Sequence, residues 1–167
     1  MIELSRKEKI KLLKIKSKKK SIINDFAQKN IDLSLESFWE VDYSINLMEK
    51  LFIKIDREIN DKEEFTFQHN KAVVIEQLTK IKSMLFPVLM ESEVLLYHLH
   101  YRETGVVCIT LKDALQYVEW IVDFTGYPKG HLDFVIIEPN LSFGICVERW
   151  GYRDTFISWG LFKQLGN

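Results

Sequence analysis

The sequence predicts a single-domain α+β protein in which N-terminal helices pack on an antiparallel sheet. Three observations predict it: a length of 167 residues, an apolar content of 47% and a change of hydrophobic period near residue 90. Before that point apolar residues recur at helical spacing, and after it they fall in short β-rich runs. We therefore expect one domain, 1–167, with residues 1–90 mainly helical and residues 91–167 forming an antiparallel sheet with one helix.

Three helices are predicted in the first half. A lysine-rich amphipathic helix covers residues 4–26, and a second runs from Val41 to Ile59. The second helix has apolar residues at i, i+3, i+7 and i+10: Ile45, Met48, Phe52 and Ile55. Residues 60–64 are expected to form a polar linker. A third helix covers residues 71–85, because its apolar stripe stops just before Pro87.

The second half is predicted as β-β-α-β-β-β. Its strands are expected at residues 93–100, 106–109, 132–137, 141–149 and 154–159. Between the second and third strands, Thr110 caps a fourth helix with Asp113 three residues on, and Gly126 and Pro128 end it. The last three runs are separated by short turns, so we expect an antiparallel meander.

Charge is distributed unevenly along the chain. Residues 1–20 hold nine Lys or Arg against two Glu, a balance of +7. The remaining 14 basic and 22 acidic residues leave the body at −8. This asymmetry bears on partners and not on fold. A basic arm on an acidic body leaves open two kinds of partner, one cationic and one anionic.

Both cysteines lie in apolar runs. Cys108 and Cys146 are therefore expected to behave as small buried hydrophobes, without a disulfide framework. The basic N-terminus is not followed by the apolar segment of a signal peptide, and no apolar run approaches the length of a membrane helix. We expect a cytoplasmic protein that has no membrane partner.

Motifs for catalysis are missing from the sequence. It has no nucleophile elbow, no glycine-rich phosphate loop and no zincin motif, so we expect a protein that is not an enzyme and needs no cofactor. His98 and His100 would share one face of a strand, as metal ligands often do. No third ligand follows at a recognised spacing, and we predict that both histidines form hydrogen bonds or face solvent. A metal-dependent enzyme built on them is the third alternative.

The final meander combines acidic and aromatic side chains. Alternation along 144–150 places Glu148 and Trp150 on one face together with Gly144, which allows a close approach. Aromatic residues beside carboxylates are typical of a surface that binds a basic protein. The alternative is that the leading helices cover this face and bury Trp150 and Trp159 as ordinary core.

A stretch of this meander resembles a known family. Residues 133–150, with the sequence DFVIIEPNLSFGICVERW, resemble small immunity proteins of bacterial polymorphic toxin systems, and the resemblance is confined to the C-terminal half. It implies a protein that binds and neutralises a cognate toxin domain, often a nuclease, inside the producing cell. The acidic body agrees in sign with such a partner, because a nuclease must itself grip phosphates.

These observations favour a toxin-neutralising binding protein with its site on the final meander. Trp150, Tyr152 and Trp159 are the expected anchors. The carboxylates expected to steer a basic partner are Asp133, Glu138, Glu148 and Asp154. The alternative is a nucleic-acid-associated regulatory protein that uses the basic first helix. Nucleic acid is not the expected partner, because that helix lacks aromatic residues and the acidic body would repel a polyanion. The oligomeric state stays open.

Overall fold

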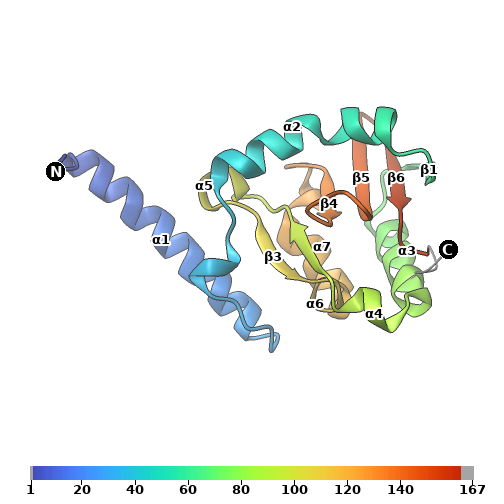
Figure 1. Cartoon of the computed structure of the whole chain (residues 1–167), viewed down its shortest axis with the longest axis horizontal. Helices are drawn as coiled ribbons and strands as arrows, with labels where there is room; N and C mark the ends of the chain where they lie inside the picture. The colour runs from blue at the N-terminus through green and yellow to red at the C-terminus, as the bar shows by residue number, and fades with distance from the viewer. Residues whose placement is uncertain (1, 163–167) are drawn as a thin grey trace.

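The computed structural model describes residues 2–162 and shows a six-stranded antiparallel sheet lying between helices (Figure 1). The strands are β1 (Lys62–Gln68), β2 (Glu93–Leu96), β3 (Val107–Thr110), β4 (Phe134–Ile137), β5 (Gly144–Trp150) and β6 (Arg153–Trp159). They are ordered β1-β6-β5-β4-β2-β3, and every neighbouring pair is antiparallel. The predicted α+β class is confirmed.

Four helices longer than two turns and several shorter ones surround the sheet within the described residues. The helices are α1 (Arg6–Ala27), α2 (Val41–Glu58), α3 (Lys71–Met84), α4 (Pro87–Met90), α5 (Tyr101–Thr104), α6 (Leu111–Gln116) and α7 (Val118–Thr125). Two 3-10 turns, η1 (Leu35–Ser37) and η2 (Tyr127–Lys129), complete the elements. The predicted bounds of α1, α2 and α3 hold to within two residues.

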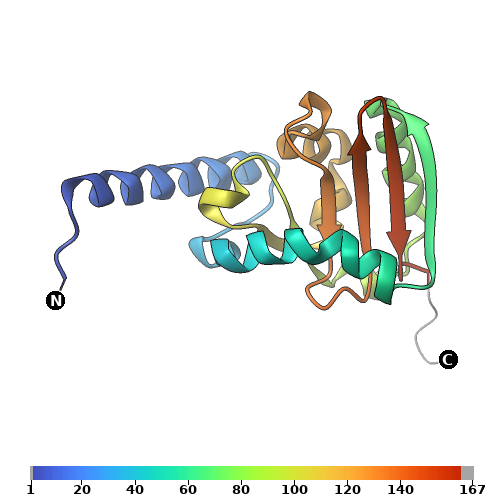
Figure 2. The same ribbon diagram turned by 90° about the horizontal axis from the view of Figure 1, so that it is seen from above.

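Each face of the sheet has its own core. On one face, buried residues of α1, α3, α6 and α7 pack on alternate residues of the strands. On the other face α2 is the only long helix in the described cluster, through a stripe that buries Leu47, Leu51 and Ile55, and Tyr101 of the short helix α5 joins it. Figure 2 shows α2 lying across one end of the strands. The other end of β1, β6 and β5 on this face therefore has less cover.

Local signals explain where the helices begin and end. Ser5 and Glu8 form a reciprocal capping box at the start of α1, and Asn70 accepts a hydrogen bond from the Ala72 N–H at the start of α3. Gly126 adopts a left-handed conformation (φ +86°) directly after α7, as glycine can without strain. Of these three, the Gly126 end is the one predicted from the sequence.

The structure corrects three details of the prediction. Residues 62–68 form the edge strand β1 and not a linker, since only Phe65 and Phe67 alternate in an otherwise polar run. The fourth helix is interrupted at Tyr117, which has non-helical angles, and becomes α6 and α7. The strand predicted at 93–100 ends at Leu96, so His98 and His100 do not share a strand face.

Helix α1 extends well beyond the body. From Arg6 to Ser17 every residue except Ile15 is exposed, whereas Ile22 and Phe26 are buried against the body. Figures 1 and 2 both show this half of the helix projecting from one side of the molecule, and we call residues 6–17 the projecting arm. Within residues 2–162, no helix has the length and apolar character needed to cross a membrane.

Candidate functional site

The structure separates the predicted aromatic anchors. Trp150 and Tyr152 lie at the end of the β5–β6 hairpin and are 67% and 90% exposed, respectively. Trp159 is only 4% exposed, and its indole N–H donates to the Leu141 carbonyl at 2.9 Å. Trp150 and Tyr152 are thus available to a partner, whereas Trp159 belongs to the core beneath α2.

Gly144 explains the position of Trp159. Gly144 and Trp159 are cross-strand partners, and a Cβ on Gly144 would lie only 2.5 Å from the Trp159 ring. The glycine does allow a close approach, as the sequence suggested, but the group that approaches is the protein's own tryptophan. This end of the sheet face is therefore filled from within.

Asp154 is also buried, and it anchors a polar cluster that we call the internal clamp: Asp154, His69, Tyr127 and Arg149. The Asp154 side chain is fully buried, with Oδ2 2.6 Å from His69 Nδ1 and accepting a hydrogen bond from the Tyr127 hydroxyl. Burial, and then the Asp154 carboxylate, raise the pKa of Tyr127 above its usual range. Asp154 therefore holds the hairpin in place and is not accessible to a partner.

Both ring nitrogens of His69 in the internal clamp have hydrogen-bond partners. His69 Nε2 lies 2.6 Å from Arg149 Nη2, and Arg149 Nη1 donates to the Tyr127 carbonyl at 3.1 Å. A buried carboxylate that orients a histidine is also found in catalytic sites. Here the outer ring nitrogen meets a guanidinium of the same chain, so this geometry fastens β1, η2 and the β5–β6 hairpin together.

Carboxylates gather on the sheet face beyond the end of α2. Phe134 pairs with Val147, so Asp133, one residue earlier, lies across from Glu148. Burial raises the pKa of Glu148, and Asp133, Asp56 and Glu64 act in the same direction, while the Trp150 side chain opposes them. We call Glu64, Asp133, Glu148, Trp150 and Tyr152 the open acidic face.

Asp133 is partly held by the backbone. Its Oδ1 accepts the Arg149 N–H at 3.0 Å, which favours the ionised form. Burial is nevertheless the largest influence and raises its pKa, with a further contribution from Asp154. Asp133, just before β4, and Glu148 in β5 are thus both harder to ionise than in water, and nearby cations would relieve that cost.

The other predicted acid, Glu138, has a local structural role. Its carboxylate accepts hydrogen bonds from the backbone N–H groups of Asn140 and Ser142, at 2.9 and 3.1 Å, and from the Ser142 hydroxyl. These bonds shape the turn between β4 and β5, where Leu141 has a positive φ. Glu138 therefore lies at the opposite end of β5 from Trp150.

Two cations border the open acidic face. Lys62 Nζ lies 3.6 Å from Asp56 and also donates to the Ile55 carbonyl. Arg153 is exposed and pairs across the hairpin with Trp150. Lys62 is bound to an acid at the end of α2, so the carboxylates of the face are only partly balanced.

The two histidines considered as metal ligands lie elsewhere. His98 is buried, its Nε2 is 3.0 Å from the Gly105 carbonyl, and its Nδ1 accepts the His100 N–H. Burial lowers the pKa of His98 to about 4, so its ring is neutral at physiological pH. Among residues 2–162 no three His, Cys, Asp or Glu side chains come together as a metal site would require.

Sequence patterns did not reveal several residues of this region. His69 and Tyr127 reach Asp154 from distant parts of the chain, Arg149 joins them through His69, and Glu64 lies in the range predicted as a linker. The period-2 placement of Phe65 and Phe67 is the one local signal that could have identified β1 and hence placed Glu64 on the sheet.

Fold and site together define an α+β protein whose six-stranded antiparallel sheet presents an acidic and aromatic face beside helix α2. The family model of the YxiF protein matches residues 22–159. The chain belongs to the YxiF protein family. Comparison with curated proteins finds no match, and comparison with solved structures finds none either.

Proposed function

We propose that this protein is an immunity-type inhibitor that binds a basic toxin domain through the open acidic face. The observation that carries the proposal is the exposure of Trp150 and Tyr152 beside carboxylates that repel one another. Large exposed aromatic residues next to unbalanced charge are a typical protein-binding surface. The resemblance of residues 133–150 to immunity proteins supports the same reading.

The proposed roles follow from burial. Trp150 and Tyr152 are the anchors, because they can lose most of their exposed area on binding. Glu148 and Asp133 attract cations of the partner, and ionisation of both becomes easier when Lys or Arg approaches. The internal clamp also positions the hairpin through the main chain. The backbone N–H of His69 donates to the Tyr152 carbonyl at 3.3 Å, next to the exposed Tyr152 ring.

A growth-rescue experiment tests the proposal. The protein is co-produced in bacteria with each toxin domain encoded in its source genome, and we expect wild type to restore growth against one of them. Trp150→Ala with Glu148→Lys should abolish that rescue, whereas Lys50→Glu, an exposed charge change on α2, should not. Full rescue by the double variant would refute the role of this face.

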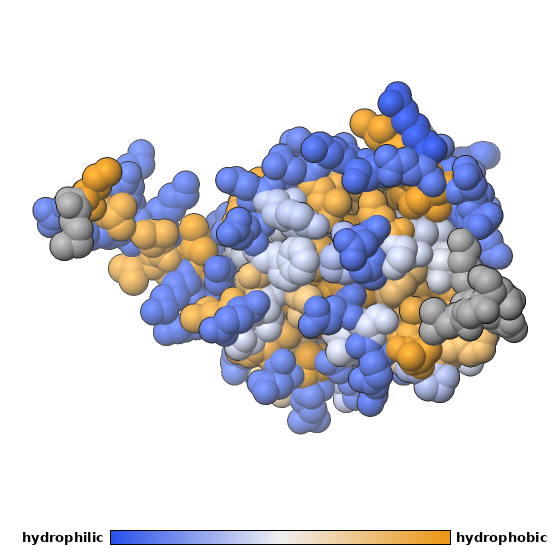
Figure 3. Space-filling view, in the orientation of Figure 1, coloured by the Kyte–Doolittle hydropathy of each residue, from blue (hydrophilic) through white to orange (hydrophobic). Residues whose placement is uncertain are grey.

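The projecting arm favours a second candidate function, association with nucleic acid. Lys7, Lys11 and Lys14 recur at i, i+4 and i+7, so they form one stripe along the arm, and Lys18, which pairs with Glu103, continues it toward the body. Arg102 lies beside this stripe in a groove between α1 and the start of α2. Because the arm projects from the acidic body, a polyanion could reach it without covering that body (Figure 3).

Salt dependence tests this second candidate. Binding of the protein to a labelled DNA duplex should weaken with a log–log slope of about −3 if the three lysines of the arm contact phosphates. The triple change Lys7→Glu, Lys11→Glu and Lys14→Glu should abolish it, whereas Lys50→Glu with Lys80→Glu on the body should have little effect. Equal binding by both variants would exclude the arm.

A further inference from the structure

The two edges of the sheet differ in how they are closed. At the β3 edge, Phe38 forms a bridge with Val107, and the Trp39 N–H donates to the Val106 carbonyl at 3.0 Å. At the other edge, β1 pairs only with β6 among the described residues. An open edge strand offers unpaired N–H and C=O groups to another strand.

The register identifies the backbone groups that face outward. The His69 N–H donates to the Tyr152 carbonyl, which marks this pair as hydrogen-bonded in the β1–β6 register. Hydrogen-bonded and non-bonded pairs alternate in antiparallel strands, so Phe65 and Phe67 direct their backbone groups toward β6. The groups directed outward are those of Glu64, Thr66 and Gln68.

The same alternation joins the edge to the open acidic face. Thr66 pairs with Thr155, which in turn pairs with Glu148, so these three side chains form one row across β1, β6 and β5. In the next rows Glu64 pairs with Ile157, and Gln68 pairs with Arg153, the cross-strand partner of Trp150. A strand added to β1 would therefore place alternate side chains beside the open acidic face.

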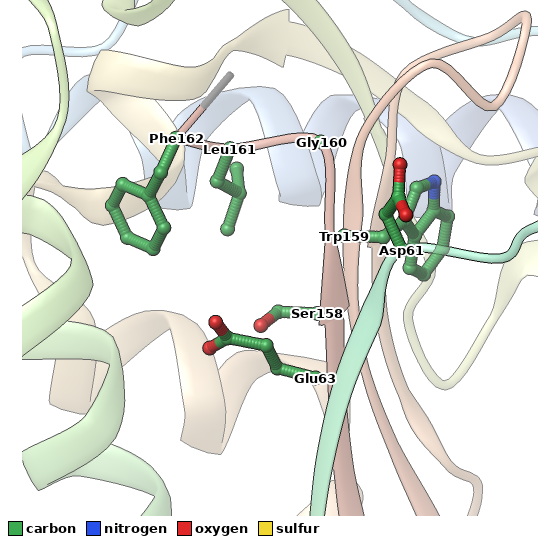
Figure 4. Close-up of a pocket in the computed structure, with 7 residues that line it drawn as sticks. All are labelled: Asp61, Glu63, Ser158, Trp159, Gly160, Leu161 and Phe162. Atoms are coloured by element: carbon green, nitrogen blue, oxygen red, sulfur yellow. The ribbon is translucent and has the colours of Figure 1, made fainter.

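Hollows at both ends of β1 could receive side chains of such a strand. The first is lined by Asp61, Glu63 and Ser158 together with residues 159–162. Figure 4 shows Glu63 and Ser158 on one side of the sheet and Asp61 on the other. The second hollow, at the hairpin end, is lined by Thr66, Phe67, Gln68, Tyr152 and Arg153.

We infer that β1 is the docking edge for an extended, basic segment of the partner, which adds to the sheet as a seventh strand. Backbone hydrogen bonds to Glu64, Thr66 and Gln68 would give affinity, and Lys or Arg side chains near Glu64 and Glu148, on the same face, would give specificity. A second copy of this chain suits the edge poorly, since two acidic edges would face each other. The inference rests on the proposed function and names the mode of contact.

Amide hydrogen exchange on isotope-labelled full-length protein tests the inference. The probe is a synthetic peptide of alternating Lys and Val, about eight residues long, close to the length of an ordinary strand. We expect the peptide to slow exchange at the Glu64, Thr66 and Gln68 amides at least about tenfold. The Phe65 and Phe67 amides, which face β6, should be protected both without and with the peptide. A matched Glu–Val peptide should change none of them.

A backbone substitution provides the decisive variant. Thr66→Pro removes one outward N–H while leaving the β1–β6 ladder intact, so we expect the protein to stay folded and bind the lysine peptide about tenfold more weakly. Thr66→Ala keeps the N–H and should bind as wild type. Equal binding by Thr66→Pro and wild type would overturn the inference, as would no protection by the lysine peptide.

Two further outcomes separate this inference from its alternatives. If the outward amides become protected without peptide as protein concentration rises, and the mass in solution doubles, a second copy occupies the edge and the inference is wrong. If Thr66→Pro still rescues cells from the toxin while Trp150→Ala with Glu148→Lys does not, the edge inference fails and the proposed function stands.

Discussion

On one side of the β5–β6 hairpin the internal clamp buries Asp154 against His69 and Tyr127, whereas on the other side the open acidic face leaves Glu148 among further carboxylates. The two clusters sit on the same pair of strands, only a few residues apart. In the clamp, Asp154 Oδ2 is bound by His69 and Tyr127, although Oδ1 has no hydrogen-bond partner among the described residues. On the open face, Glu148 is surrounded mainly by other acids. The contrast fits the proposed division of roles, in which the first cluster stabilises the fold and the second binds a partner at some cost to stability.

The largest expected effect comes from breaking the clamp. Asp154→Ala should lower the free energy of unfolding by about 3 kcal/mol, because the half-buried His69 and the buried Tyr127 hydroxyl lose their shared acceptor. For a chain of this size that corresponds to a fall of very roughly 10 °C in Tm, measured by calorimetry. Thr155→Ala, on the opposite face of β6, should change Tm by at most a few degrees.

The next effect is on binding and should leave stability unchanged. Trp150→Ala removes an exposed ring, so we expect Tm to stay within about 1 °C of wild type while affinity for the toxin falls by about 2 kcal/mol, or roughly 30-fold. Calorimetric titration measures the affinity. A large fall in Tm would show that Trp150, like Asp154, stabilises the fold.

Reversal of one charge should act mainly on the rate of association. Glu148→Lys should slow association with a basic partner about tenfold at low ionic strength, and the difference should shrink as salt rises. Surface plasmon resonance at two salt concentrations separates this from a change in dissociation. An association rate equal to that of wild type at low salt would argue against steering by this face.

The smallest effect has an unusual sign. The pKa of the Glu148 carboxyl is higher in the folded protein than its ordinary value of 4.5 in the unfolded chain. The folded protein therefore becomes less stable as the pH rises from 4.5 toward the folded-state pKa, because the unfolded chain ionises first. Glu148→Gln removes that loss, so it should stabilise the protein by a few tenths of a kcal/mol at pH 7 and not at all below pH 4.5. Denaturant unfolding at both pH values checks the sign. Equal or lower stability at pH 7 would mean that Glu148 is already balanced by cations.

Regular elements with a strong periodic pattern could be predicted from the sequence. The helical spacing in α2 and the position of Pro87 after α3 predict the bounds of those helices almost to the residue. The fully buried stripe of α2 nevertheless contains Leu47 and Leu51, whereas the predicted Met48 and Phe52 are only partly buried. The strand β1 was missed because an exposed edge carries polar residues and offers little apolar alternation. The β-propensity of individual residues predicts an edge strand poorly, because β1 is held in the sheet by pairing with one neighbour, β6.

The candidate site was predictable only in part, for a different reason. Alternation correctly placed Glu148 and Trp150 on one face of β5. It could not reveal that Asp154 meets a histidine 85 residues earlier in the chain, because no local pattern encodes a long-range contact. Nor could it show whether Trp159 would fill the space above Gly144 or leave it to a partner.

The exposure of Trp150 has a practical consequence. Its indole is in water, whereas that of Trp159 is enclosed beneath α2. Contact with a partner that excludes water from Trp150 would move its fluorescence emission to shorter wavelength. The hairpin thus carries a built-in optical probe, and Trp150→Phe would show how much of the signal comes from that one ring.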